Sequence, residues 1–242
     1  MNATKHESHI SIEGTSCFVH HWKPTSPSGA PPKGLVVIYH GFLAHGGYPT
    51  VRYAAEFFQQ DGYAVIAVDF PGHGKCDGLP GYIPSSDEMI SYGVAMADHA
   101  MSLYDNKGES PKSPPLILCG SSMGGAIALA VAHRLEARQT DSSVALTNVL
   151  VVLLAPMLQL GVSSLERTAL QCLSLIVPKV QLIPSSATDS SKQYRDPAKR
   201  QECEDDTLTI GGNLRVCSAL TCVDLTLHVQ SIAPTLTCPY LL

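Results

Sequence analysis

A serine with the surroundings of a nucleophile stands near the middle of the chain, within Leu-Ile-Leu-Cys-Gly-Ser-Ser-Met-Gly-Gly-Ala at 116–126. Ser122 has Gly120 two residues before it and Gly124 two residues after it, whereas Ser121 lacks this spacing. Such glycines let a strand turn sharply into a helix and leave the serine hydroxyl exposed. The backbone amide of Met123 would then face the point where a carbonyl oxygen becomes an oxyanion. The pattern predicts attack of Ser122 on an acyl carbonyl, and the alternative is a turn without chemistry.

Two glycine-containing loops follow other apolar runs and are expected at the same edge. Tyr-His-Gly-Phe at 39–42 follows the apolar run at 35–39, and we assign the amide of Phe42 as the second oxyanion donor. Asp-Phe-Pro-Gly-His-Gly at 69–74 follows the next. We expect His40 and His73 to hold these loops rather than to act as bases.

The elements that would position these residues alternate along the chain. The predicted strands are 35–39, 63–69, 116–119 and 149–154, preceded by a hairpin around Gly14. The predicted helices are 48–60, 87–104 and 122–135. Strands that are almost wholly apolar and alternate with helices predict an α/β fold, a mostly parallel sheet with helices on both faces. Ligands bind beyond the carboxyl ends of such strands, where the three loops fall.

The pattern changes after Pro156. We predict an α/β core over 1–156, a helical lid over 157–232, and the start of a further core strand over 233–242, within which the chain ends. We therefore expect the final strands and helices of the fold to be missing, as in an incomplete gene model, a splice variant or a fragment. The amphipathic helix expected at 165–180, which stops near Pro178, would either contact an acyl chain or membrane surface, or pack against the sheet.

Composition narrows the class of protein. Of 242 residues, 45% are hydrophobic and 15% charged, so the chain can bury a large core, and a net charge of −5 argues against nucleic acid as a partner. The eight cysteines lack zinc-binding spacing, and the polar N-terminus has no apolar signal segment. We expect a cytoplasmic protein with reduced thiols, which contacts membranes at most peripherally through its lid.

The motifs together carry a resemblance. Gly-Ser-Ser-Met-Gly-Gly-Ala, His-Gly-Phe and Asp-Phe-Pro-Gly-His-Gly, in this order, are similar to those of the α/β-hydrolases, and most similar to the monoacylglycerol lipases and serine aminopeptidase-type hydrolases. The resemblance implies a lipid or other small ester substrate, an acyl-enzyme on Ser122, and no metal or organic cofactor. Tyr194, in a lid segment that resembles the Tyr…Asp-Pro segment of the family, would bind substrate.

The chain also departs from this family. Cys76 stands where relatives usually carry serine, a change we expect to be tolerated. In this fold the catalytic acid and then the histidine follow the nucleophile along the chain. The only histidines after Ser122 are His133, about 16 Å further along the same helix, and His228 in the lid. We therefore expect little or no turnover, and two alternatives stay open: a non-catalytic acyl-binding fragment, and a peptidase or acyltransferase on the same fold.

Overall fold

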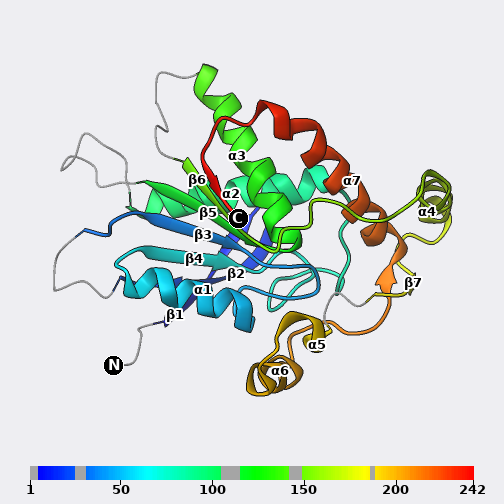
Figure 1. Ribbon diagram of the computed structural model, residues 1–242, viewed down its shortest axis with the longest axis horizontal. Coiled ribbons are helices and arrows are strands. Elements are labelled where there is room, and N and C mark those ends of the chain that lie inside the picture. Colours follow the sequence, from blue (N-terminus) through cyan, green and yellow to red (C-terminus); the bar gives the residue numbers. More distant parts are fainter. Residues whose placement is uncertain (1–4, 25–30, 105–114, 142–148, 186–188) are drawn as a thin grey trace.

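Within the residues that the structure describes, a seven-stranded sheet runs in the order β1-β2-β4-β3-β5-β6-β9 (Figure 1). The computed structural model describes residues 5–24, 31–104, 115–141, 149–185 and 189–242. The strands are β1 Lys5–Ile12, β2 Thr15–Trp22, β3 Leu35–Tyr39, β4 Ala64–Val68, β5 Leu116–Ser121, β6 Val149–Leu154 and β9 Tyr240–Leu241. In this sheet order, all neighbouring strands from β4 to β9 are parallel, whereas the β1–β2 and β2–β4 pairs are antiparallel. The predicted α/β fold class is therefore confirmed.

Helices cover both faces of this sheet. Val36 and Ile38 of β3 pack against α1 (Pro49–Gln60) on one face. Val37 and Tyr39, which point the opposite way, join the larger core beneath α2 (Ser86–Tyr104) and α3 (Met123–Asp141). Because side chains alternate along a strand, burial on both faces requires the near-continuous apolar sequence that β3 and β4 show.

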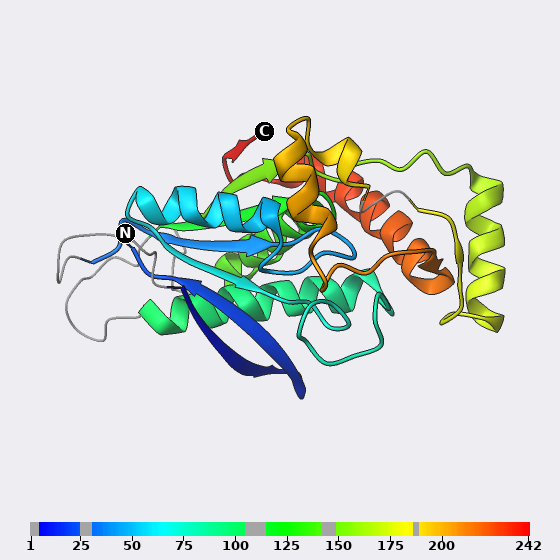
Figure 2. The same ribbon diagram turned by 90° about the horizontal axis from the view of Figure 1, so that it is seen from below.

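The predicted hairpin is present at the edge of the sheet. β1 and β2 pair throughout their length around Glu13 and Gly14, which both have positive φ angles, 49° and 81°. Such a two-residue turn matches the twist of the paired strands. Figure 2 shows the hairpin extending beyond the helical layer.

Between β6 and β9 the chain forms a largely helical segment. It contains α4 Ser164–Ile176, β7 Gln181–Ile183, α5 Ser190–Gln193, α6 Pro197–Glu204, β8 Leu214–Arg215 and α7 Val216–Ile232, followed by the 3-10 turn η1 Ala233–Thr235. Residues 186–188 of this segment lie outside the described residues. The short β7–β8 pair was not predicted, since two to three residues carry no periodicity.

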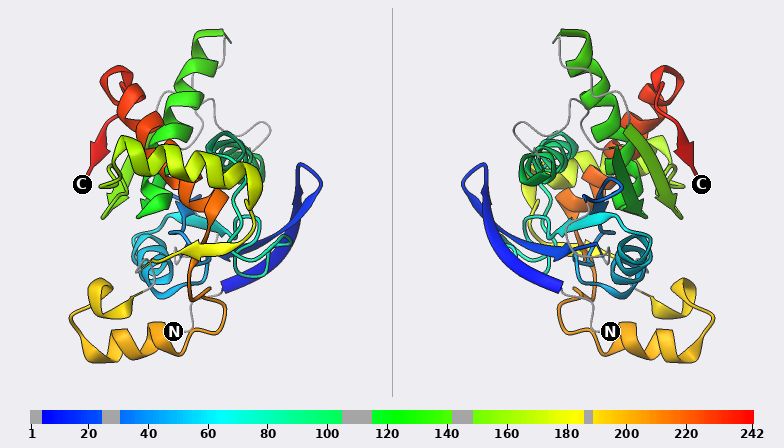
Figure 3. Two further views of the ribbon diagram at one scale, coloured as in Figure 1. Left: turned by 90° about the vertical axis from the view of Figure 1, so that its right-hand side faces the viewer. Right: turned by 90° about the vertical axis from the view of Figure 1, so that its left-hand side faces the viewer.

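The first helix of this segment does not lie on the sheet. α4 ends at Ile176, two residues before Pro178, near which the helix was predicted to stop. Figures 2 and 3 show α4 at one end of the molecule, while α5 and α6 lie beside α1. No residue of α4 is buried, and Leu165, Leu175 and Ile176 are 79%, 87% and 78% exposed. The alternative that this helix packs against the sheet is therefore wrong. An ion pair from Arg167 to Asp224 joins the helix to α7 instead.

Of the described helices, one stretch has the length and apolar composition to cross a bilayer. It is Val216–Thr235, α7 with η1, whose mean hydropathy is 1.3. However, 56% of this stretch is buried, and residues such as Leu225 and Val229 belong to the main core. This burial is typical of a core helix in a globular domain.

The last strand begins later than the sequence indicated. The expected start was near Thr237, but the carboxylate of Glu136 accepts hydrogen bonds from the amides of Thr237 and Cys238, and β9 spans only Tyr240–Leu241 beside Val151 and Val152 of β6. Its side chains are exposed.

The crossing of α2 over α3 gives a test of this packing. A Cβ atom on Gly93 would lie 2.7 Å from Val131 Cγ2 and 3.0 Å from Ile127 Cγ2, too close for either branched side chain. We expect Gly93→Val to lower the free energy of unfolding by about 1–3 kcal/mol through overpacking, measured by urea denaturation.

Gly161 provides the matched control, since a Cβ atom there meets nothing within 4 Å. Gly161→Ala should change the unfolding free energy by no more than about 0.5 kcal/mol. Equal stability of Gly93→Val and wild type would contradict the observed helix crossing.

Candidate active site

Ser122 stands at the junction of β5 and α3 in a strained conformation. Its φ angle is +53°, unusual for a residue with a side chain, and it is exposed although residues 123–132 behind it are buried. The end of β6 holds this backbone: the Ser122 amide donates to Leu154 O over 3.1 Å, and the Ser122 carbonyl accepts from Met157 N over 2.9 Å. The structure thus presents the Ser122 side chain to solvent at the carboxyl edge of the sheet.

The two glycines flanking Ser122 are required by close backbone contacts. A Cβ atom on Gly120 would lie 2.1 Å from Gly124 O, and one on Gly124 would lie 2.0 Å from Tyr39 O. Neither gap admits a carbon atom. The spacing that singled out Ser122 therefore has a steric cause, namely contact of the start of α3 with the ends of β3 and β5.

The loop after β3 lies directly against the serine. A Cβ atom on Gly41 would be 3.5 Å from Ser122 Cβ, so the next residue, Phe42, enters the same neighbourhood. Within the described residues the Phe42 amide donates to no acceptor. Met123 is the first residue of α3, where an amide has no partner inside the helix and the helix dipole favours negative charge. The structure thus brings together Ser122 and the two segments predicted to supply the oxyanion donors.

His40 holds this loop in place, in line with the structural role expected for it. Its Nδ1 is 2.8 Å from Gly41 O, and its Nε2 accepts a hydrogen bond from Phe70 N over 2.9 Å. Both ring nitrogens are therefore occupied. Complete burial lowers the pKa of His40 to about 3, so the ring is neutral at physiological pH.

His73 packs against the same loop. Its Nδ1 is 3.0 Å from Pro71 O, and its ring centroid lies 5.8 Å from that of Phe42 and 5.4 Å from that of His40. Burial lowers the pKa of His73 to about 4. In the described residues, neither histidine is hydrogen-bonded to Ser122.

A buried carboxylate that the sequence analysis did not single out joins three segments. Asp69, fully buried at the end of β4, accepts hydrogen bonds from Gly46 N over 2.6 Å and Lys75 N over 2.8 Å, and its Oδ1 is 3.2 Å from His20 Nε2. Burial alone would raise the pKa of Asp69, but the contact with His20 and the amide donors lower it to about 2. An acidic residue at the end of an apolar strand is the signal that could have revealed this anchor.

His20, His45 and Asp69 also place one potential metal ligand atom each within 4.8 Å of one another. Their hydrogen bonds already occupy these atoms. The His45 ring accepts from Gly47 N at Nδ1 and pairs with Asp206 through Nε2, while both oxygens of Asp69 accept amides. The cluster is accounted for as a hydrogen-bond network that positions loops.

The lid segment is attached to the core through polar contacts at α1. His45 Nε2 is 2.9 Å from Asp206 Oδ2, and Tyr194 Oη is 2.8 Å from Thr50 Oγ1. Burial would raise the pKa of Asp206, but the hydrogen bond with His45 and those from Leu208 N and Thr209 N lower it. The structure thus uses Tyr194 to fasten α5 and α6 to α1; its predicted role in substrate binding stays a prediction.

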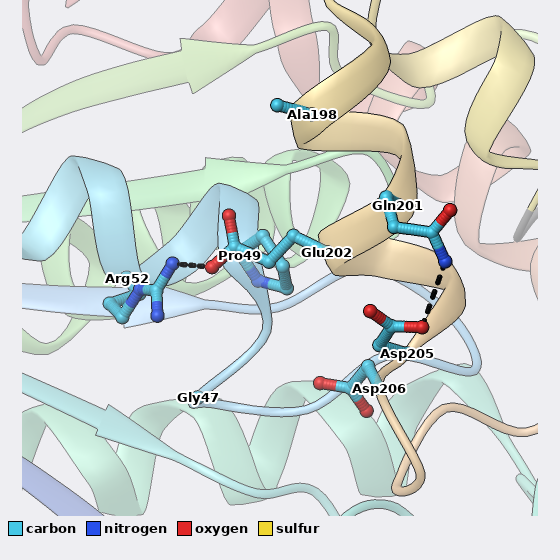
Figure 4. Close-up of a pocket in the computed structure, with 8 residues that line it drawn as sticks. All are labelled: Gly47, Pro49, Arg52, Ala198, Gln201, Glu202, Asp205 and Asp206. Atoms are coloured by element: carbon cyan, nitrogen blue, oxygen red, sulfur yellow. Dashed lines mark hydrogen bonds and ion pairs between the residues drawn. The ribbon is translucent and has the colours of Figure 1, made fainter.

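A cavity of about 400 Å³ lies in this junction (Figure 4). It is lined by Gly47, Pro49, Arg52, Ala198, Gln201, Glu202, Asp205 and Asp206. Arg52 points toward Glu202, and Gln201 bonds to Asp205. Neither Ser122 nor the loop at 41–43 lines it, so this cavity is separate from the candidate nucleophile.

The two histidines that follow Ser122 lie together, away from it. His228 of α7 is close enough to Arg134 and His133 of α3 that, with partial burial, they lower its pKa. All ten histidines fall within the described residues, and none is hydrogen-bonded to the Ser122 hydroxyl.

Known proteins share this sequence and fold. The family model of the serine aminopeptidases, S33, matches residues 30–242. The chain belongs to this family. Human monoglyceride lipase is 27% identical over 240 residues, covering 96% of this chain and 70% of its own, and the monoacylglycerol lipase of Mycolicibacterium smegmatis is 26% identical over 227 residues, covering 91% and 70%. A monoacylglycerol lipase structure from Paleococcus ferrophilus superposes with a TM-score of 0.69 at 21% identity, covering 93% of this chain and 75% of that one.

These findings confirm the α/β-hydrolase fold and the predicted family. They also support a general function for this S33 family member, namely a hydrolase of the lipase type that acts on esters.

Asp69 makes the stability of this S33 family member depend on pH. Its folded pKa, about 2, lies below the ordinary value of 3.8, so its contribution is fully present above pH 3.8 and is lost as pH falls toward 2. The difference corresponds to about 2 kcal/mol. We expect Asp69→Asn to lower the unfolding free energy at neutral pH by at least this amount, and the deficit to shrink in acid.

Urea denaturation across this pH range measures the effect. Asp61→Asn is the matched control, because the Asp61 side chain is 58% exposed and pairs only with Lys33 at the surface. A deficit for Asp69→Asn that stays constant with pH would show that the ionised form of Asp69 is not the anchor.

Proposed function

We propose that this chain is a carboxylic-ester hydrolase whose substrate is a monoacylglycerol and whose reaction passes through an acyl-enzyme on Ser122. The observation that carries the proposal is the exposed, strained Ser122 beside the amides of Phe42 and Met123. The substrate class comes from the monoglyceride lipases that match nearly the whole chain.

In the proposed reaction, Ser122 Oγ attacks the ester carbonyl carbon while its proton passes to a base. The carbonyl oxygen becomes an oxyanion and accepts hydrogen bonds from the two amides, which are already oriented by β3 and α3. Collapse of the intermediate breaks the ester C–O bond and releases the glycerol as its alcohol. Water then attacks the acyl-enzyme and releases the fatty acid. This scheme uses no metal or organic cofactor.

The base is the missing component. His40 and His73 are buried, neutral and engaged in loop contacts, and His133 and His228 lie together on α3 and α7. Without a base the serine hydroxyl is a weak nucleophile, although oriented amides retain part of the catalytic power. We propose that the chain by itself turns over esters slowly or not at all.

The exposed apolar side chains of α4 support a lipid partner. Leu165, Leu175 and Ile176 present their surfaces to solvent on a helix that lies apart from the sheet. Apolar area of this kind marks interaction surfaces. We propose that it meets an acyl chain or a membrane surface, in a protein that is cytoplasmic and at most peripheral on membranes.

A second candidate function follows from the absent base: a non-catalytic acyl-binding protein. A peptidase or acyltransferase activity would depend on the residues that line the lid. Binding without hydrolysis distinguishes the binding protein, and acceptor preference distinguishes the transferases.

Addition of a base from solution tests the proposal. With a p-nitrophenyl fatty acyl ester, we expect imidazole to accelerate hydrolysis by the wild-type chain, because imidazole replaces the histidine that Ser122 lacks. Ser122→Ala should lower the imidazole-dependent rate by roughly 100-fold or more, to the level of imidazole alone. The rate of p-nitrophenol release measures it.

Ser121→Ala is the matched control, since Ser121 lies next to Ser122 without its glycine spacing, and it should retain the rescued rate. Turnover without imidazole that disappears in Ser122→Ala would show that a base is present after all. No Ser122-dependent rate, together with binding of an ether analogue of monoacylglycerol, would favour the acyl-binding protein.

A further inference from the structure

Two thiols lie side by side beneath the loop that follows β4. Cys76 Sγ is 3.2 Å from Cys17 Sγ of β2 and 3.3 Å from Ser16 O. The Cys76 thiol donates a hydrogen bond to either atom. Cys17 is fully buried, whereas Cys76 keeps 8% of its surface in contact with solvent. Such an approach of two sulfur atoms brings them within reach of a covalent bond after a small movement.

The backbone holds these sulfur atoms together. Asp77 N donates to Ser16 O over 3.2 Å, so the residue after Cys76 is hydrogen-bonded to the residue before Cys17. Cys76 N donates to His73 O over 3.0 Å, which fixes the turn that carries the thiol. The encounter of the two thiols is therefore built into the fold and needs no rearrangement of the sheet.

No other pair of cysteines in the described part of the chain has its sulfur atoms in contact. Cys119 and Cys222 are buried singly, and burial raises the pKa of each thiol to about 12, which makes them poor targets for oxidants. Cys172 is exposed but lies on α4, apart from the sheet. The pair is thus distinct among the eight cysteines.

We propose that Cys17 and Cys76 form an oxidant-sensitive modification site, which hydrogen peroxide converts into an intramolecular disulfide and which thiol reductants restore. In the first step one thiolate attacks a peroxide oxygen; the S–O bond forms, the O–O bond breaks, and hydroxide leaves, taking up a proton as water. In the second step the other sulfur attacks the sulfenic sulfur; the S–S bond forms, the S–O bond breaks, and the hydroxide that leaves takes up the proton of the second thiol as water. Two thiols and one peroxide give one disulfide and two waters.

The surroundings indicate which sulfur reacts first. The hydrogen bond from Cys76 lowers the pKa of the Cys17 thiol against the opposing effect of burial, while the same contact raises the pKa of Cys76. Cys17 is therefore the sulfur that loses its proton more readily, and Cys76 resolves the sulfenic acid. Cys76, which is 8% exposed, is the member of the pair in contact with solvent.

The disulfide would connect β2 to the loop that supports the candidate site. His73 of this loop packs against Phe42 and His40, which shape the proposed oxyanion donor. Any effect of oxidation on ester hydrolysis rests on the proposed function, whereas formation of the disulfide does not. The test therefore reads the thiols themselves.

Intact mass and thiol counting test the proposal on the folded chain of 242 residues. After titration with hydrogen peroxide, we expect a mass loss of two hydrogens and two fewer maleimide labels on the denatured protein than the eight of the reduced chain. Proteolytic peptides that contain Cys17 and Cys76 should be crosslinked, and dithiothreitol should restore both labels.

Variants keep the result interpretable. Cys76→Ser retains a hydroxyl beside Ser16 O and should abolish the intramolecular loss of labels, whereas Cys172→Ser should leave it unchanged. Circular dichroism of each variant confirms folding, and Cys17→Ala serves as the second variant should one fail to fold. Peroxide treatment that leaves all eight thiols labelled, or oxidises Cys17 and Cys76 no faster than Cys119, would overturn the proposal.

Discussion

The candidate site depends on one close backbone contact, between the first turn of α3 and the end of β3. Gly124 lies so near Tyr39 O that no carbon substituent fits, and Gly120 is confined by Gly124 in the same way. This contact compels the chain to turn at Ser122 with φ +53°, a conformation that costs about 1–3 kcal/mol and persists only where surrounding structure imposes it. The same contact brings the loop at 41–43 beside the start of α3, so this one contact positions the proposed nucleophile and both proposed amide donors.

Buried polar groups then fix the loops around this contact. Asp69 joins the loop at 45–47, the turn at 69–75 and β2, while His40 links the loop after β3 to Phe70. Because these groups lie in a low-dielectric interior, leaving any of them unpaired would be costly, and the network therefore has essentially one satisfied arrangement. His45 extends the network outward to Asp206, which attaches the lid segment to the same loops.

Sequence patterns predicted what local chemistry determines. The glycine spacing around Ser122, the apolar runs of β3 to β6 and the hairpin around Gly14 each arise from residues close in the chain, and the structure has them. Long-range pairings had no such signal. The partners of Asp69 and of Tyr194 are up to 144 residues away, and the two-residue strand β8 is too short for any periodicity. The separation of α4 from the sheet was also missed, because an amphipathic pattern indicates an apolar face without naming what covers it.

The proposed nucleophile and a histidine base are positioned by different means. The position of Ser122 and its amides follows from backbone contacts among β3, β5, β6 and α3, which need no charged group and lie within residues 39–157. A histidine base requires a separate loop end and a carboxylate to orient it. Under the proposed function, amide orientation and proton transfer are therefore separate requirements. The proposed amide donors would favour a polarised carbonyl oxygen through their orientation alone, and the reaction of Ser122 would depend on the proton acceptor that reaches its hydroxyl.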